Sequence, residues 1–284
     1  MADNIKTPLG FVSLTNGAKA IYPMNDIFLN YAFEDPANWE ALRLTINILL
    51  YAYKQKYPCT TVEMIEGNIK VRTQFRHLLE TDIKTTRNQD FEIIEDDENI
   101  TFIEFQNRAQ THPPIEIRSV EYFGLGISRN RGKQANQIWL LAEDLKSVLN
   151  GKVFARYILK DEATNYVHPA TSGIMYVSLL KLSKEKGPAG ELASFLLGKT
   201  TDPKDDSVKK IAEALKTCFN DFKTNKDVVK MLTLAERYLD EGEARGISIG
   251  EARGAKKLAE LIKSGLSPDE ALNKLNEEKH ELTD

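Results

Sequence analysis

The sequence has few of the residues that build metal clusters and disulfide scaffolds. It contains only two cysteines, Cys59 and Cys218, which lie far apart and outside any CxxC or Cys/His pattern. This spacing argues against a zinc site and a disulfide framework, so we expect free thiols. The histidines His77, His112 and His168 show no mutual spacing typical of a metal or nucleophile site, and we assign them no role.

Long hydrophobic runs are also missing. The longest apolar stretches, such as INILL (46–50) and IMYVSLL (174–180), are far shorter than the roughly 20 residues that a membrane-spanning helix needs. The opening MADNIKTPLG has no basic region followed by an apolar one, so we predict no secretion signal, no membrane partner and a cytoplasmic location. A net charge of -4 argues against a protein that coats nucleic acid indiscriminately, although it leaves room for a local basic groove.

The chain has enough apolar residues for a sizeable core. Hydrophobic residues make up 42% of its 284 positions. The pattern predicts a loop segment over residues 1–22 and a helix–strand domain over 23–184. Helices are predicted over 25–35, 36–54, 115–129 and 137–150. Strands are predicted as a hairpin or short pair over 61–75, as a hairpin over 89–106, and over 152–160 and 173–182.

The C-terminal region, residues 185–284, reads as almost wholly helical. Asp206 or Ser207 is expected to cap its first long helix. The pentamer GEARG occurs twice, at 242–246 and 250–254. Two interpretations of this tail stay open, because a charged helix can simply be solvated or can serve self-association or a partner.

The strand predicted from ITFIEFQ (100–106) carries two polar residues near its end. Residues two apart share a face of a strand, so Glu104 and Gln106 point the same way. The preceding strand, QDFEII, has Asp90 at its start. In an antiparallel hairpin the start of one strand lies beside the end of the other, which brings Asp90 within reach of Glu104 and Gln106.

Two adjacent carboxylates predict a cation site. In a partly dry cleft such groups repel each other unless a cation lies between them. Oxygen ligands of this kind suit Mg²⁺ or Mn²⁺, which keep several waters and accept phosphate oxygens. Such an ion can lower the pKa of bound water and polarise a phosphodiester, so the pattern indicates hydrolytic nuclease chemistry.

The arrangement of Asp90, Glu104, Phe105 and Gln106 resembles the core of the PD-(D/E)XK nuclease superfamily. It is similar to the branch called recombination-promoting nuclease or putative transposase (Rpn, YhgA-like), whose third motif is often Glu-x-Gln instead of Glu-x-Lys. The likeness is collinear from about residue 24 to residue 265. It includes the opening helix MNDIFLNYAF (24–33), the helix RSVEYFGLGIS (118–128), the closing strands over 152–184 and the Glu/Arg/Gly-rich tail.

The resemblance implies an α/β, restriction-endonuclease-like fold. A mixed central sheet flanked by helices would form a nuclease-like domain over 23–184, followed by an α-helical C-terminal region over 185–284. The implied activity is metal-dependent DNA endonuclease action linked to recombination, mobile elements or phage defence. DNA and a second copy of the chain, as a homo-oligomer and candidate dimer, are the implied partners.

Site roles follow from the same resemblance. Asp90 and Glu104 would bind Mg²⁺ (or Mn²⁺), with the backbone carbonyl of Phe105 as a third ligand. Gln106 would orient the attacking water in place of a lysine, but without the positive charge that a lysine would supply. Asp82 is an alternative to Asp90 at a longer separation. A different interpretation stays open, in which Asp90 is a strand-start cap and Glu104 a surface residue.

Further residues complete the implied site. Asp26 and Glu40 are candidates for an accessory acid, with a helix cap or a surface charge as the alternative. Arg118, Arg129, Arg131 and Lys133 form a local basic cluster that could hold DNA phosphates or could be ordinary surface. A competing hypothesis is a catalytically weak or inactive nuclease-fold module that acts through protein–protein contacts of its helical tail.

Overall fold

A computed structural model describes the greater part of the chain. The described residues are 24, 26–58, 60, 62–73, 90–95, 99–106, 114–130, 133–166 and 173–224, with positions 257, 260, 261, 263, 264 and 267. The chain divides into two compact units, Met1–Val228 and Val229–Asp284. The loop expected over 1–22 and both GEARG pentamers lie outside the described residues.

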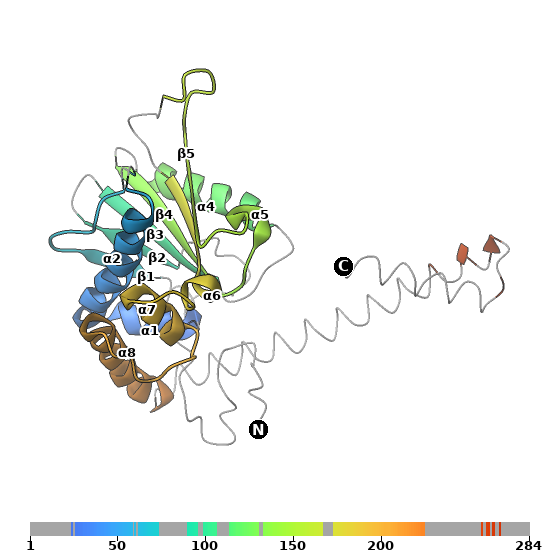
Figure 1. Ribbon diagram of the computed structural model, residues 1–284. Coiled ribbons are helices and arrows are strands. Elements are labelled where there is room, and N and C mark those ends of the chain that lie inside the picture. Colours follow the sequence, from blue (N-terminus) through green and yellow to red (C-terminus); the bar gives the residue numbers. More distant parts are fainter. Residues whose placement is uncertain are drawn as a thin grey trace. The chain divides into compact units, whose positions relative to one another are not determined.

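Six strands form one mixed sheet in the order β1-β2-β3-β4-β6-β5 (Figure 1). The strands are β1 Lys70–Thr73, β2 Phe91–Ile94, β3 Asn99–Gln106, β4 Gln134–Leu141, β5 Phe154–Ile158 and β6 Gly173–Ser178. The first three pair antiparallel, β4 runs parallel to β3 and β6 parallel to β4, and β5 is antiparallel to β6. The expected α/β class is therefore confirmed, as a mixed sheet flanked by helices.

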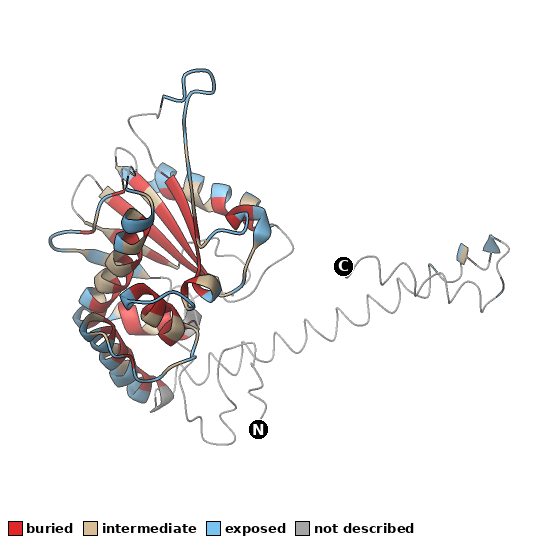
Figure 2. Cartoon of the chain, viewed as in Figure 1, coloured by how far each residue is buried: buried red, intermediate tan, exposed pale blue. Residues whose placement is uncertain are grey.

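Helices cover both faces of this sheet (Figure 1). One face carries α1 (Asp26–Glu34), the 3-10 turn η2 (Pro36–Asn38) and α2 (Trp39–Lys56); the other carries α4 (Ile115–Arg129) and α5 (Lys146–Leu149). Phe33 of α1 packs edge-on against Phe91 of β2, with ring centroids 5.6 Å apart. Tyr122 of α4 stacks on Trp139 of β4 at 6.1 Å. The strands between them are largely buried (Figure 2).

The helices α6 (Leu179–Leu182), α7 (Pro188–Leu196) and α8 (Asp206–Thr224) belong to the same unit as the sheet. Phe222 of α8 packs against Phe28 of α1 at 5.3 Å. The compact unit thus continues past residue 184, where the sequence placed a domain boundary, to Val228. None of the helices within the described ranges is long and apolar enough to cross a membrane.

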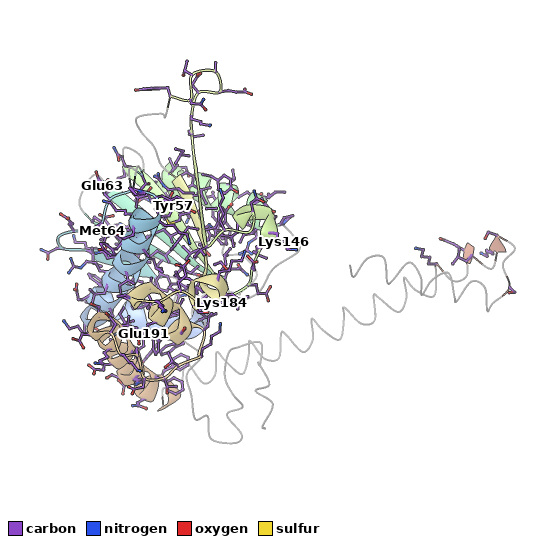
Figure 3. The ribbon with its side chains drawn as sticks, viewed as in Figure 1. Tyr57, Glu63, Met64, Lys146, Lys184 and Glu191 are labelled. Carbon is purple, nitrogen blue, oxygen red and sulfur yellow. The ribbon has the colours of Figure 1, made fainter. Side chains whose placement is uncertain are left out.

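The cap of α8 differs from the one expected at Asp206 or Ser207. Asp205 caps this helix, because its Oδ1 accepts the backbone N–H groups of Ser207 and Val208 at 2.9 and 3.2 Å. Glu191 of α7, labelled in Figure 3, accepts the N–H of Asp205 at 2.6 Å. This bond ties the loop before α8 to α7.

The helix predicted over 137–150 is wrong for most of its length. Residues Gln134–Leu141 form the parallel strand β4, and only Lys146–Leu149 are helical. A strand buried on both faces has no polar alternation, so a short apolar run such as QIWLL cannot be told from a buried helix by its periodicity. Similarly, the strand predicted over 173–182 ends at Ser178, and α6 follows.

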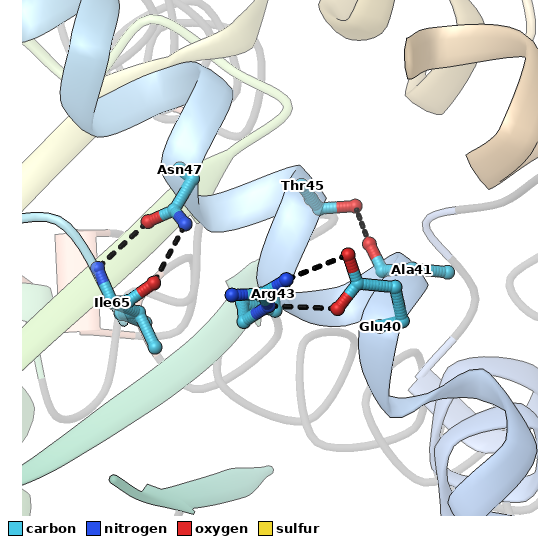
Figure 4. A network of polar contacts seen from close by, with 6 residues as sticks. All are labelled: Glu40, Ala41, Arg43, Thr45, Asn47 and Ile65. Carbon is cyan, nitrogen blue, oxygen red and sulfur yellow. Dashed lines mark hydrogen bonds and ion pairs between the residues drawn. The ribbon is translucent and has the colours of Figure 1, made fainter. Parts of the chain in front are cut away.

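The strand pair predicted over 61–75 is also wrong within the described residues. Of residues 62–73, only Lys70–Thr73 form a strand. The side chain of Asn47 on α2 binds the backbone of Ile65 on both sides (Figure 4): Nδ2 donates to the carbonyl at 2.9 Å, and Oδ1 accepts the N–H at 2.8 Å. These two bonds occupy the backbone groups that a neighbouring strand would otherwise pair.

Replacing Asn47 by Ala is expected to lower the free energy of unfolding by about 1–3 kcal/mol, because the buried backbone of Ile65 loses both partners. Urea denaturation measures this change. Asn220→Ala is the matched control, since Asn220 is an exposed helical asparagine and both substitutions gain the same helix propensity. Equal midpoints for the two variants would contradict the role of Asn47.

Candidate functional site

Asp90 and Glu104 lie side by side, at the start of β2 and near the end of β3. The register pairs Phe91 with Ile103, so the next opposing pair is Asp90 and Glu104. The N–H of Asp90 donates to Oε1 of Glu104 at 3.2 Å, and the N–H of Phe105 donates to Oδ2 of Asp90 at 2.8 Å. Each carboxylate of this carboxylate pair is therefore fixed by a backbone amide of the other segment.

The carboxylate pair lies in a low-dielectric setting. Glu104 is only 5% exposed and Asp90 is half-buried. Acidic side chains are seldom buried unless a partner compensates their charge, and two of them together repel. A divalent cation between them would remove this repulsion.

A third oxygen comes from the backbone of β3. The carbonyl of Gln106 accepts the N–H of Ala142 at 3.0 Å and so faces β4. Because successive carbonyls of a strand alternate in direction, that of Phe105 faces the β2 side, where Asp90 lies. Within the described ranges no three His, Cys, Asp or Glu side chains gather. Among the described residues, two carboxylates and one carbonyl could hold an ion here together with water, and such a donor set suits Mg²⁺ or Mn²⁺.

Gln106 is bonded to a buried arginine. Nη1 of Arg118, near the start of α4, donates to Oε1 of Gln106 at 3.1 Å. Arg118 is 8% exposed, and its guanidinium carbon lies 5.6 Å from the ring centroid of Tyr122 and 5.4 Å from that of Trp139. Arg118 is therefore packed beneath the helix, next to the end of β3, and is not part of an open basic surface.

The structure does not bring Arg129 or Lys133, two other members of the predicted basic cluster, to the carboxylate pair. Arg129 ends α4, about 16 Å along the helix axis from Arg118. Lys133 precedes β4 and lies next to the Asn99 end of β3, about 20 Å along the strand from Glu104. Arg131 lies outside the described residues.

Of the candidate accessory acids, Glu40 is described and is not joined to the carboxylate pair. Arg43 binds Glu40 through two hydrogen bonds of 2.7 and 2.8 Å (Figure 4), and these hold the pKa of Glu40 below its usual value. Both residues are on α2, which covers the opposite face of the sheet from α4. Asp26 begins α1, but its side chain is outside the described part, as is Asp82.

Sequence reasoning missed the aromatic floor of the site, which consists of Trp139 on β4 and Tyr176 on β6. Trp139 is the register partner of Glu104 across the β3–β4 pair, and Tyr176 of β6 is the next partner along. The Tyr176 hydroxyl shares a hydrogen bond with that of Ser119 on α4. Burial raises the pKa of Tyr176 to about 12, so this phenol stays neutral at physiological pH and is no general base. Reading QIWLL as a strand would have revealed Trp139.

The same face carries a further charge pair at the edge of the sheet. Arg72 of β1 lies opposite Glu92 of β2, with Nη1 and Oε2 3.5 Å apart. Glu92 is two residues from Asp90, so polar side chains continue from Gln106 to the edge strand. Charges placed opposite each other in KVRT and DFEI were the sequence signal for this pair.

A hollow of about 650 Å³ lies on the other side of the molecule, between α2 and α7. Its lining is mostly apolar and includes Leu44, Ile48, Tyr51, Met64 and Pro188. Met64 is labelled in Figure 3, beside α2. The hollow shares no residue with the carboxylate pair and offers none of its chemistry.

Comparison of the chain with family models, with curated proteins and with solved structures finds no match. The function is therefore inferred from the residues of the site.

Proposed function

We propose that the chain is a metal-dependent DNA endonuclease of the recombination-promoting, transposase-associated type. It would hydrolyse phosphodiester bonds with Mg²⁺ or Mn²⁺ held by Asp90 and Glu104. The observation that carries this proposal is the carboxylate pair, locked between two backbone amides at the end of the β2–β3 hairpin. Its link to recombination, mobile elements or phage defence rests on the motif alone.

Each residue of the site has a separate task in this proposal. Asp90 and Glu104 hold the ion, and the carbonyl of Phe105 faces the same side. The bound ion supplies Lewis acidity toward the scissile phosphate and toward a water. Gln106, on the same face of β3 as Glu104, orients that water by hydrogen bonding.

The architecture supports the same proposal. Three antiparallel strands, a helix and a fourth strand parallel to the third place the acidic residues on adjacent strands at one end of the sheet. A mixed sheet between helices is compatible with the restriction-endonuclease-like fold, which we propose for this unit.

Cleavage of supercoiled plasmid by the purified full chain tests the proposal. We expect cleavage with Mg²⁺ or Mn²⁺, none with EDTA, and a rate at least about 100-fold lower for Glu104→Ala, because transition-state stabilisation by the ion is lost. The exposed carboxylate Glu63 gives the control variant Glu63→Ala, which should cleave as the wild type does.

Three outcomes would overturn the proposal. Metal-independent cutting or undiminished cutting by Glu104→Ala would remove the carboxylate pair from the reaction. Lack of cleavage with every metal would favour the competing hypothesis of a nuclease-fold module that works through its helical tail.

A further inference from the structure

Among the residues that the structure describes, Arg118 is a buried cation without a carboxylate partner. None of the ion pairs among the described residues includes it, and its polar contact is the side-chain oxygen of Gln106. The faces of Tyr122 and Trp139 offset part of the desolvation of the guanidinium. Burial of a charge without a counter-ion is unfavourable, so a cation kept in this position points to a task in the site.

Arg118 determines how the amide of Gln106 is turned. A guanidinium only donates hydrogen bonds, so the atom of Gln106 that faces it must be the oxygen. The NH₂ group of the same amide is then directed away from Arg118. Gln106 consequently presents N–H donors on the face of β3 that also carries Glu104.

We infer that Arg118 is the positioning residue that gives Gln106 the donor character of a lysine ammonium. A charged donor on the amide oxygen polarises the whole amide and strengthens the hydrogen bonds that its NH₂ group donates. Those N–H groups hold the attacking water or the negative charge that develops on the scissile phosphate. This inference rests on the proposed function and names the source of the positive charge that Glu-x-Gln lacks.

The surroundings of Arg118 fix its guanidinium over the strand next to β3. The guanidinium lies over Trp139, the register partner of Glu104 on a strand about 5 Å away. Trp139 is fully buried, so this floor is rigid. Arg118 therefore acts through Gln106 from a fixed position, unlike the exposed Arg129 at the far end of the same helix.

A charge exchange between positions 106 and 118 tests the inference. Arg118→Met should lower kcat for DNA cleavage about 10- to 100-fold with little change in KM, since only the donor strength of Gln106 falls. Gln106→Lys should be slow as well, because it places two cations together. The double variant Gln106→Lys/Arg118→Met restores one positive charge and should recover at least about 10-fold over Arg118→Met.

The pH profile adds a readout that a purely structural role would leave unchanged. The double variant carries a titratable ammonium at position 106, so its cleavage rate should fall at alkaline pH relative to that of the wild type. Gln106→Glu is a second variant that is expected to fold, because its carboxylate pairs with the guanidinium of Arg118 and compensates that positive charge. It removes the N–H donors and should be as slow as Arg118→Met.

The outcomes separate this inference from the proposed function. Lys216→Met, a charge loss on the exposed face of α8, is the control and should behave as the wild type. If Glu104→Ala is inactive while Arg118→Met and Gln106→Glu cleave at the wild-type rate, the inference is overturned and the nuclease stands. A double variant as slow as Arg118→Met overturns it too. If Glu104→Ala still cleaves, the nuclease proposal and this inference both fall.

Discussion

Asp90→Asn is expected to stop metal-dependent DNA cleavage while leaving the metal-free protein folded and at least as stable as the wild type. Asn keeps an oxygen that can accept the N–H of Phe105, as Oδ2 of Asp90 does at 2.8 Å. It removes the charge that attracts the cation, so the cleavage rate should fall on the order of 1000-fold. It also removes the repulsion between positions 90 and 104. The loss of this repulsion stabilises the metal-free protein.

Asp90→Ala should behave differently from Asp90→Asn. Alanine supplies no acceptor, so the buried N–H of Phe105 loses its partner, which destabilises the fold by about 1–3 kcal/mol. Both variants should be inactive, but only the alanine variant should unfold earlier. The comparison therefore separates the structural role of Asp90 from its role as a ligand.

Thermal unfolding with and without Mn²⁺ measures both effects. Binding to the folded state raises the free energy of unfolding by about 2.7 kcal/mol when the metal is present at 100 times its Kd. The wild-type Tm should therefore rise with Mn²⁺, and that of Asp90→Asn should not. A metal-induced rise that survives in Asp90→Asn would place the ion elsewhere.

Trp139→Ala is expected to have the largest effect on stability. Trp139 is 0% exposed and lies between Tyr122 and Tyr176, with centroid distances of 6.1 and 6.4 Å. Truncating a buried aromatic side chain to alanine typically lowers the free energy of unfolding by about 3–5 kcal/mol. For a protein of this size that corresponds to a Tm lower by roughly 10 °C. Because Arg118 loses one of its two rings, cleavage should slow as well.

Trp139→Phe should be far milder. The indole Nε1 of Trp139 is buried and has no hydrogen-bond partner within the described structure. Phenylalanine keeps an aromatic ring over which Arg118 can lie and removes this unsatisfied donor, which offsets part of the lost packing. We expect a loss below about 1.5 kcal/mol.

Urea denaturation compares the two tryptophan variants, with Tyr166→Ala as the control at an exposed aromatic position. The alanine variant should have the lowest midpoint and the control a midpoint like that of the wild type. Similar midpoints for Trp139→Ala and Trp139→Phe would show that the aromatic floor adds little to stability.

The β2–β3 hairpin could be predicted from the sequence because its signals are local. Two apolar-rich runs flank a polar turn, and the antiparallel geometry alone brings the start of β2 to the end of β3. The adjacency of Asp90 and Glu104 follows from that geometry. Which amides fix them depends on atomic positions that no pattern specifies.

The rest of the site depends on tertiary structure. β4 was predicted as helix because a strand buried on both faces gives an unbroken apolar run. Without β4 there was no Trp139 beside Glu104, and therefore no reason to expect Arg118 to be buried over its ring. Charge alone favours a surface position for an arginine, and here the aromatic contacts outweigh that preference.

The two strand pairings that build the site, β2–β3 and β3–β4, also differ in the conformational entropy that the chain loses when the strands come together. Phe91 pairs with Ile103 only twelve positions later, whereas Asn99 pairs with Gln134 thirty-five positions later. For flexible loops of these lengths the second closure is less favourable by about 1 kcal/mol. The acidic residues thus belong to the pairing that the unfolded chain reaches most easily, and Arg118 and Trp139 to the one that demands more ordering of the chain.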